Sequence, residues 1–114
     1  MLDPDLDRLL ALDGEVLTVS LDGDYYVRFI VRNVESSAGR RHGLVYSLTL
    51  HGPDKGRILG FDNAHPVPPR KRDEPHDHVH VGDTVKPYDY RNAAALLQDF
   101  WTAVYSLLHE RGIT

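Results

Sequence analysis

The sequence predicts an α+β domain: an antiparallel sheet of four to five mostly meander-connected strands, a short N-terminal helix and a long amphipathic C-terminal helix packed on the sheet. Two observations support this. β-type segments joined by short turns follow one another along the chain, and the last part has helical spacing. Strands grouped in one run, with a helix after them, favour α+β over βαβ units. The 114 residues, 41% of them hydrophobic, fit a single domain spanning 1–114.

The first elements are a short helix and a two-stranded hairpin. Asp3 and Pro4 match an N-cap and a first helical residue, and the leucines after them share a helical face until Asp13-Gly14. Residues 15–21 are rich in β-formers, Asp22-Gly23 is a hairpin signal, and residues 25–32 alternate between two faces. We expect two antiparallel strands here.

Two more strands and a long connection occupy the middle of the chain. Residues 44–51 alternate, "GPDKG" at 52–56 is typical of a tight turn, and residues 57–62 follow as a fourth strand. The stretch 65–77 holds four prolines and six charged residues, which indicates a long surface loop. A short strand at 78–81 is then expected to end at Gly82-Asp83.

The C-terminal segment is predicted to be a helix that lies across the sheet. Its apolar residues recur at spacings of three, four and seven, and Gly112 follows the last turn. The residues on this apolar face are Leu96, Leu97, Phe100, Trp101, Val104, Leu107 and Leu108.

Composition excludes several classes of function. The net charge of −4 argues against nucleic-acid binding by global attraction, so any such contact has to be local. The absence of cysteine removes disulfides, thiolate metal sites and cysteine nucleophiles. The acidic N-terminus does not resemble a signal peptide, and no stretch has a membrane-spanning length. We therefore expect a cytoplasmic protein without membrane contact.

The stretch "EPHDHVHVGD" places histidines at every second position. On a strand, His78 and His80 lie on the same face with Cα atoms roughly 7 Å apart, close enough for both imidazoles to reach one ion or one phosphate. His76 joins them only if the strand starts that early. Asp62, Asn63 and His65, at the end of the preceding strand, form a second polar cluster that meets the first if the two strands pair.

Several interpretations of these residues remain open at this point. In the simplest interpretation, the histidines are only the solvated face of an edge strand. In a second, His78, His80 and His65, or Asp62, hold a divalent metal ion. In a third, two histidines act as general base and general acid in RNA cleavage, with phosphate charge stabilised by Arg57, Arg70, Lys71 or Arg72. The histidine triad of nucleotide hydrolases fits poorly, because Asp77 and Gly82 interrupt its pattern.

The order "YSLTLH", "GRILGFDNAH", "HVHVGD" and "AAALLQDFW" resembles the TumE family of toxin-antitoxin proteins from about Tyr46 to the end of the chain. The matching positions are Asp62, Asn63, Ala64 and His65, then His78, His80, Val81 and Gly82, then Leu96, Leu97, Asp99 and Phe100. Two features depart from that family's pattern. Asp77 separates histidines that are adjacent in many members, and the loop 65–77 has its own length and charge.

The resemblance implies a toxin with a cognate small DNA-binding antitoxin as its partner. By analogy with other small toxins, it implies a ribonuclease that acts on RNA without a metal cofactor. His78, His80, His65 and Asp62 are then expected to be catalytic, and the expected substrate contacts are Asn63, Arg57, Arg70, Lys71 and Arg72. The competing interpretation is a metal-binding or antitoxin-binding module with no hydrolytic activity. A divalent metal ion and a homodimer both remain open.

Overall fold

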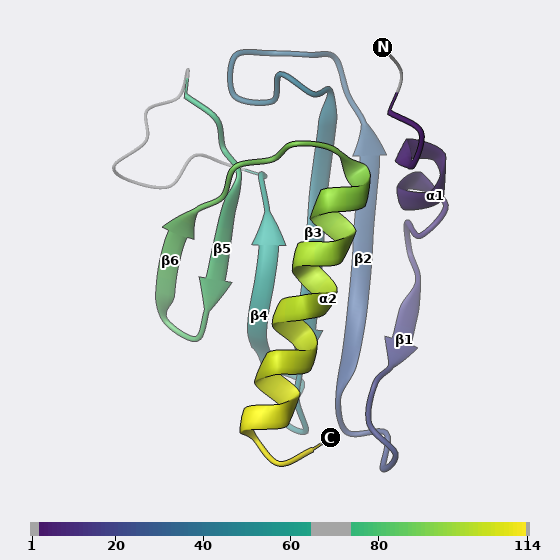
Figure 1. Ribbon diagram of the computed structural model, residues 1–114, viewed down its shortest axis with the longest axis vertical. Helices are drawn as coiled ribbons and strands as arrows, with labels where there is room; N and C mark the ends of the chain where they lie inside the picture. Colours follow the sequence, from purple (N-terminus) through teal and green to yellow (C-terminus); the bar gives the residue numbers. More distant parts are fainter. Residues whose placement is uncertain (1–2, 65–73, 114) are drawn as a thin grey trace.

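The computed structural model describes residues 3–64 and 74–113. Within them the elements follow in the order α1 (Leu6–Leu10), β1 (Val16–Thr18), β2 (Tyr26–Asn33), β3 (Leu44–His51), β4 (Arg57–Asp62), β5 (His78–Val81), β6 (Thr84–Pro87) and α2 (Ala93–Glu110). This is the predicted α+β architecture (Figure 1). Neither described helix is long and apolar enough to cross a membrane.

The sheet is an antiparallel meander in which every strand pairs with the next one along the chain. It contains six strands in the described residues, so the prediction of four to five was too low. The strand missed is β6. Gly82-Asp83, taken as a strand end, is the tight turn of a β5–β6 hairpin in which Val81 pairs with Thr84. Gly82 has a φ of 57°, which suits glycine at such a turn.

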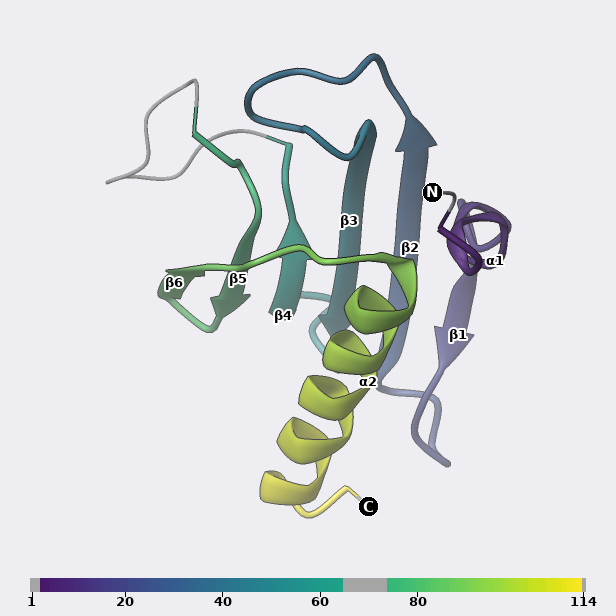
Figure 2. The same ribbon diagram turned by 45° about the horizontal axis from the view of Figure 1, so that its top comes forward.

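One face of the sheet carries α2, and the hydrophobic core lies between them (Figures 1 and 2). Every second residue of β3, from Leu44 to Leu50, is buried against the helix, as the alternation predicted. Phe100 of α2 meets Phe29 of β2 edge to face at 5.8 Å between ring centroids. The other helix residues buried in this core are Ala93, Leu96, Val104 and Leu108.

The two helices begin differently from the sequence-based expectation. Asp3 was predicted to cap α1, but the N-cap of α1 is Asp5, without a side-chain hydrogen bond. The Oδ1 atom of Asp3 accepts a hydrogen bond from the backbone N–H of Asp5 at 3.2 Å, just before α1, and its Oδ2 atom accepts one from the N–H of Ala93 at 2.7 Å, in the first turn of α2. The side chain of Asn92 accepts a second one from Ala95 N–H. The N-terminal segment thus helps to fix the start of the C-terminal helix.

The sheet face opposite α2, called the open face below, has no described helix over it (Figure 2). The strand register places Arg28 and Ile30 of β2, Ser47 and Thr49 of β3, and Gly60 of β4 on this face. Arg28 and Ile30 are exposed. The exposed side chains of this face are available to a ligand, whereas the alternate residues of β2 and β3 form the core.

Candidate functional site

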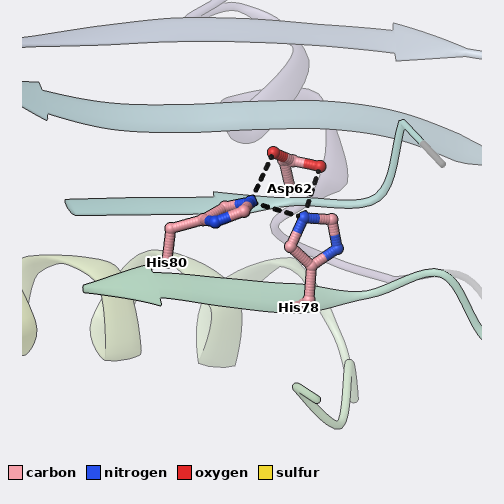
Figure 3. A group of neighbouring side chains, drawn as sticks. All are labelled: Asp62, His78 and His80. Carbon is pink, nitrogen blue, oxygen red and sulfur yellow. Dashed lines mark hydrogen bonds and ion pairs between the residues drawn. The ribbon is translucent and has the colours of Figure 1, made fainter. Parts of the chain in front are cut away.

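The predicted histidine pair lies on the open face beside the end of β4. Because β4 and β5 pair directly, Asp62 lies opposite His78 and Gly60 lies opposite His80. Asp62, one of the three residues of the cluster expected at the end of β4, therefore meets His78 and His80, as expected if these strands pair. Figure 3 shows the side chains of Asp62, His78 and His80 turned toward one another.

The three side chains form a close, largely buried cluster. The Nε2 atoms of His78 and His80 are 2.8 Å apart. Asp62 Oδ1 lies 3.1 Å from His78 Nε2, and Asp62 Oδ2 lies 3.8 Å from His80 Nε2. His78 is 1% exposed and Asp62 7%, while the side chain of His80 is 14% exposed. His80 is therefore the histidine of the pair that is nearer to solvent.

Backbone groups fix the orientation of His78 and Asp62. His78 Nδ1 donates to the carbonyl oxygen of His76 at 2.8 Å, so this nitrogen carries a proton and Nε2 is the atom presented to the cluster. Asp62 Oδ1 accepts a hydrogen bond from the N–H of Ala64. In a metal-free protein a proton has to lie between the two Nε2 atoms, because two lone pairs at this distance would repel.

Arg57 and Gly60 extend the site along the open face. A Cβ placed on Gly60 would lie 3.1 Å from Arg57 Cδ and 3.4 Å from Thr49 Cγ2. The stem of Arg57 therefore crosses Gly60, the residue that pairs with His80. Glycine at position 60 leaves space for the arginine beside the histidine pair. A positive charge at this position can stabilise an anion bound there.

Asn63, an expected substrate contact, is fully buried. Its Oδ1 accepts from the N–H of Tyr46 at 2.9 Å, and its Nδ2 donates to the carbonyl of Leu44 at 2.7 Å. These bonds tie the residue after β4 to the backbone of β3. Asn63 thus positions the end of β4, which carries Asp62.

Four other predicted site residues, His65, Arg70, Lys71 and Arg72, lie outside the described residues. Their roles stay predictions.

His76, expected to join the pair only if the strand started earlier, lies before β5 and supports the site through its backbone. Its carbonyl oxygen accepts the His78 bond, and its N–H donates to the carbonyl of Gly39 at 3.0 Å. Its ring packs so closely on Gly39 that a Cβ there would lie 2.3 Å from His76 Nε2. The segment 34–43, between β2 and β3, is thereby attached to the start of β5. Arg40 adds hydrogen bonds to the carbonyls of Asn63 and Ala64.

Another polar cluster, formed by Asp77, Tyr46 and His42 and called the second cluster below, lies on the other side of the sheet. The sequence did not reveal it. Asp77 points away from His78 and is 2% exposed. Its Oδ2 accepts from the hydroxyl of Tyr46 at 2.7 Å and lies 3.0 Å from His42 Nε2. His42 packs on Tyr90 with ring centroids 4.1 Å apart. A tyrosine in an otherwise apolar stripe signals a hydroxyl that needs a partner, but nothing in the sequence identified His42.

Burial makes the tyrosines near this second cluster difficult to ionise. It raises the pKa of Tyr46 far above its usual range, and the adjacent carboxylate of Asp77 acts in the same direction. Burial also raises the pKa of Tyr90 to about 12. These side chains are therefore neutral hydrogen-bonding groups at physiological pH.

The geometry of the first cluster is compatible with two chemistries. Ligand atoms of Asp62, His78 and His80 all lie within 4.8 Å of one another, which fits a two-histidine, one-carboxylate metal site. The bond from His78 Nδ1 to a carbonyl is also typical of a metal-ligating histidine. A metal-free histidine pair that shares a proton next to a carboxylate fits the same distances.

Comparison with known proteins identifies the family. The family model described as Toxin TumE matches residues 10–108. The chain belongs to the TumE toxin family. This confirms the resemblance seen in the sequence and identifies the toxin component of a toxin-antitoxin system, which implies an antitoxin partner. No match was found among curated proteins or among solved structures.

Proposed function

We propose that this TumE protein is a metal-independent endoribonuclease whose reaction centre is the cluster of Asp62, His78 and His80. The observation that supports the proposal is the 2.8 Å separation of the two Nε2 atoms, with a carboxylate oxygen 3.1 Å from one of them. Such a pair can accept a proton from the substrate and later return it, so that neither hydroxide nor hydronium from the solvent is needed. The antitoxin in this proposal is a small DNA-binding protein.

His80 has the better access and is the residue that meets the substrate. It removes the proton of a ribose 2′-hydroxyl, and the 2′-oxygen attacks the adjacent phosphorus. The positive charge that the pair gains is spread to His78, where Asp62 and the carbonyl of His76 stabilise it.

Bond breaking returns the proton. As the bond from phosphorus to the 5′-oxygen breaks, the histidine pair donates its proton to that leaving oxygen. The products are a 2′,3′-cyclic phosphate and a free 5′-hydroxyl, and the protein ends in its starting protonation state. Arg57, next to His80, stabilises the charge on the phosphate oxygens.

The test is cleavage of defined RNA by purified protein in the presence of a chelator. We expect wild-type protein to leave cyclic phosphate ends, and His80→Ala and Asp62→Asn to lose about 10²–10⁴ in rate, the usual contribution of acid–base groups. His109→Ala is the matched control, because His109 is exposed near the end of α2. Folded wild-type protein that leaves RNA intact, together with His78 and His80 variants that remain toxic, would refute the proposal.

The second candidate function is a metal-binding module that uses the same three ligands, as the 4.8 Å cluster permits. Elemental analysis separates the two. Stoichiometric metal that is lost in His78→Ala or His80→Ala would favour the metal site, and metal-free cleavage with a bell-shaped pH profile would favour the paired histidines.

A further inference from the structure

The open face carries a concentration of positive charge that the composition hides. The protein has 17 acidic and 13 basic residues, not counting histidine, and a net charge of −4. The strand register nevertheless places Arg28 and Arg32 of β2 on the open face, and the stem of Arg57 crosses Gly60 there. Among the described strands, the acidic residue on this face is Asp62, which lies inside the histidine cluster. In the strands that the structure describes, the open face therefore carries three arginines and one carboxylate.

The arginines of this face are available for a ligand. Arg28 and Arg32 are exposed, and so is Arg57. Among residues 3–64 and 74–113, no side chain forms an ion pair or hydrogen bond with any of these three guanidinium groups. A guanidinium group without a carboxylate partner keeps its planar donors available for bidentate contacts with phosphate.

Aromatic surface lies beside the arginines. Tyr26 and His51 face each other across β2 and β3, with ring centroids 4.9 Å apart and planes 7° from parallel. The hydrogen bonds of His51 to Lys55 and Thr49 hold its ring in this orientation. Ile30, between the two arginines of β2, is 37% exposed. Flat rings and an apolar side chain between positive charges are typical of surfaces on which unpaired bases stack.

The strand pairing aligns this surface with the reaction centre. One cross-strand row runs from Arg28 through Thr49 and Gly60 to His80. Three strand spacings separate its ends, or roughly 14 Å between Cα atoms. A nucleic-acid strand that crosses the sheet along this row meets Arg28 first, then Arg57, and then the histidine pair.

We propose that the open face is the binding track for single-stranded RNA, with Arg28, Arg32 and Arg57 contacting phosphates and the Tyr26–His51 stack contacting bases. The inference rests on the proposed ribonuclease function and specifies how its substrate is bound. Single-stranded RNA is favoured over an acidic protein segment because the latter has no use for the ring surface. It is favoured over an RNA duplex because paired bases are not free to stack on side chains.

Binding and cleavage can be measured separately. A fluorescent single-stranded RNA is titrated with His80→Ala protein, in which cleavage is blocked, and with the same protein carrying Arg28→Gln and Arg32→Gln. Log K falls linearly as log salt rises. Each lost phosphate contact makes the slope of this dependence shallower by about 0.7, so the double change makes it shallower by about 1.4. Affinity is then about 25-fold weaker at ~0.1 M salt, and the difference disappears near 1 M.

Two further variants control for charge and fold. Arg8→Gln with Arg111→Gln removes the same charge from α1 and the end of α2, and we expect a nearly unchanged slope. Arg28→Lys with Arg32→Lys keeps the charge and should restore most of the slope. The binding track would be wrong if the Arg8/Arg111 control lost as much affinity and salt dependence as the Arg28/Arg32 variant. It would also be wrong if the protein bound polyglutamate or duplex RNA as tightly as single-stranded RNA.

The outcome also separates this inference from the proposed reaction. If wild-type protein cleaves RNA and the Arg28/Arg32 variant binds and cleaves equally well, the track is wrong and the ribonuclease function stands. If single-stranded RNA binds through Arg28 and Arg32 but no RNA is cleaved, the track stands and the proposed reaction is wrong.

Discussion

Replacing Gly39 by alanine tests the attachment of segment 34–43 to His76 and the histidine pair. The new Cβ would lie 2.3 Å from Nε2 and 2.6 Å from two carbons of the His76 ring, much closer than non-bonded atoms approach. The ring must move, and His76 is only 8% exposed. Overpacking of this kind costs about 1–3 kcal/mol, which lowers the Tm of a domain of this size by ~4 °C or more per kcal/mol.

A double-mutant cycle identifies the cause of that destabilisation. His76→Ala removes the ring that the new methyl group would meet, so Gly39→Ala should cost almost nothing in that background. The expected coupling free energy is therefore about 1–3 kcal/mol. Urea unfolding followed by fluorescence is suitable because Trp101 is the single tryptophan of the chain and packs against the core. Gly52→Ala is the matched control, since its Cβ would make an ordinary contact at 3.5 Å with Tyr25.

The same cycle also has a functional readout. The carbonyl of His76 holds His78 Nδ1, so displacement of His76 should reduce RNA cleavage more than the loss of folded protein explains. A Gly39→Ala cost that is equal with and without the His76 ring would refute this account of the close contact.

Two other predictions concern the tyrosines of the second cluster. Tyr46→Phe removes the hydroxyl that donates to Asp77 at 2.7 Å, and because the acceptor is a buried carboxylate we expect a loss of about 1.5–3 kcal/mol in the free energy of unfolding. An unchanged urea midpoint would contradict this. The second prediction concerns alkaline pH. Burial raises the pKa of Tyr90 to about 12, and the pKa values of Tyr46 and Tyr88 rise as well, chiefly through burial. The unfolded chain releases these protons first, near the usual tyrosine pKa of ~10, so stability should be constant below that pH and fall above it. Tyr46→Phe should make this fall shallower, and a free energy of unfolding that stays level up to pH ~11 would contradict the sign.

The middle strands were predictable because local and tertiary signals agree there. Residues 44–51, 57–62 and 78–81 form strands with the predicted bounds. In β3, each apolar residue of the alternation has a place in one core. The turn 52–56 and the Gly82-Asp83 pair fix the adjacent ends. Under these conditions the hydrophobic pattern alone determines register and face.

Other elements depend on contacts that the sequence does not encode locally. Strand β6 has four exposed residues, so it lacks the apolar alternation that reveals a strand, and its pairing with β5 defines it. Asp3 had the local features of a cap for α1, and its side chain does accept the N–H of Asp5, but it also accepts a backbone N–H 90 positions away, which no local pattern predicts. His42 contacts Asp77 over 35 positions. Contacts between residues so far apart in the sequence form only in the complete fold, so a local sequence motif cannot predict them.

The tripeptide His76-Asp77-His78 connects the cluster of Asp62, His78 and His80 with the second cluster through three consecutive residues. Extended backbone turns successive side chains to opposite faces, so His78 contacts His80 and Asp62 while Asp77 points to His42 and Tyr46 on the other side. His76 contacts segment 34–43 through its ring and orients His78 through its carbonyl. If the histidine pair is catalytic as proposed, a change at Asp77 is expected to act on it through the backbone and not through charge at the substrate. The distinction is measurable, because a positioning defect lowers the cleavage rate at all pH values, whereas a lost acid or base changes the shape of the pH profile.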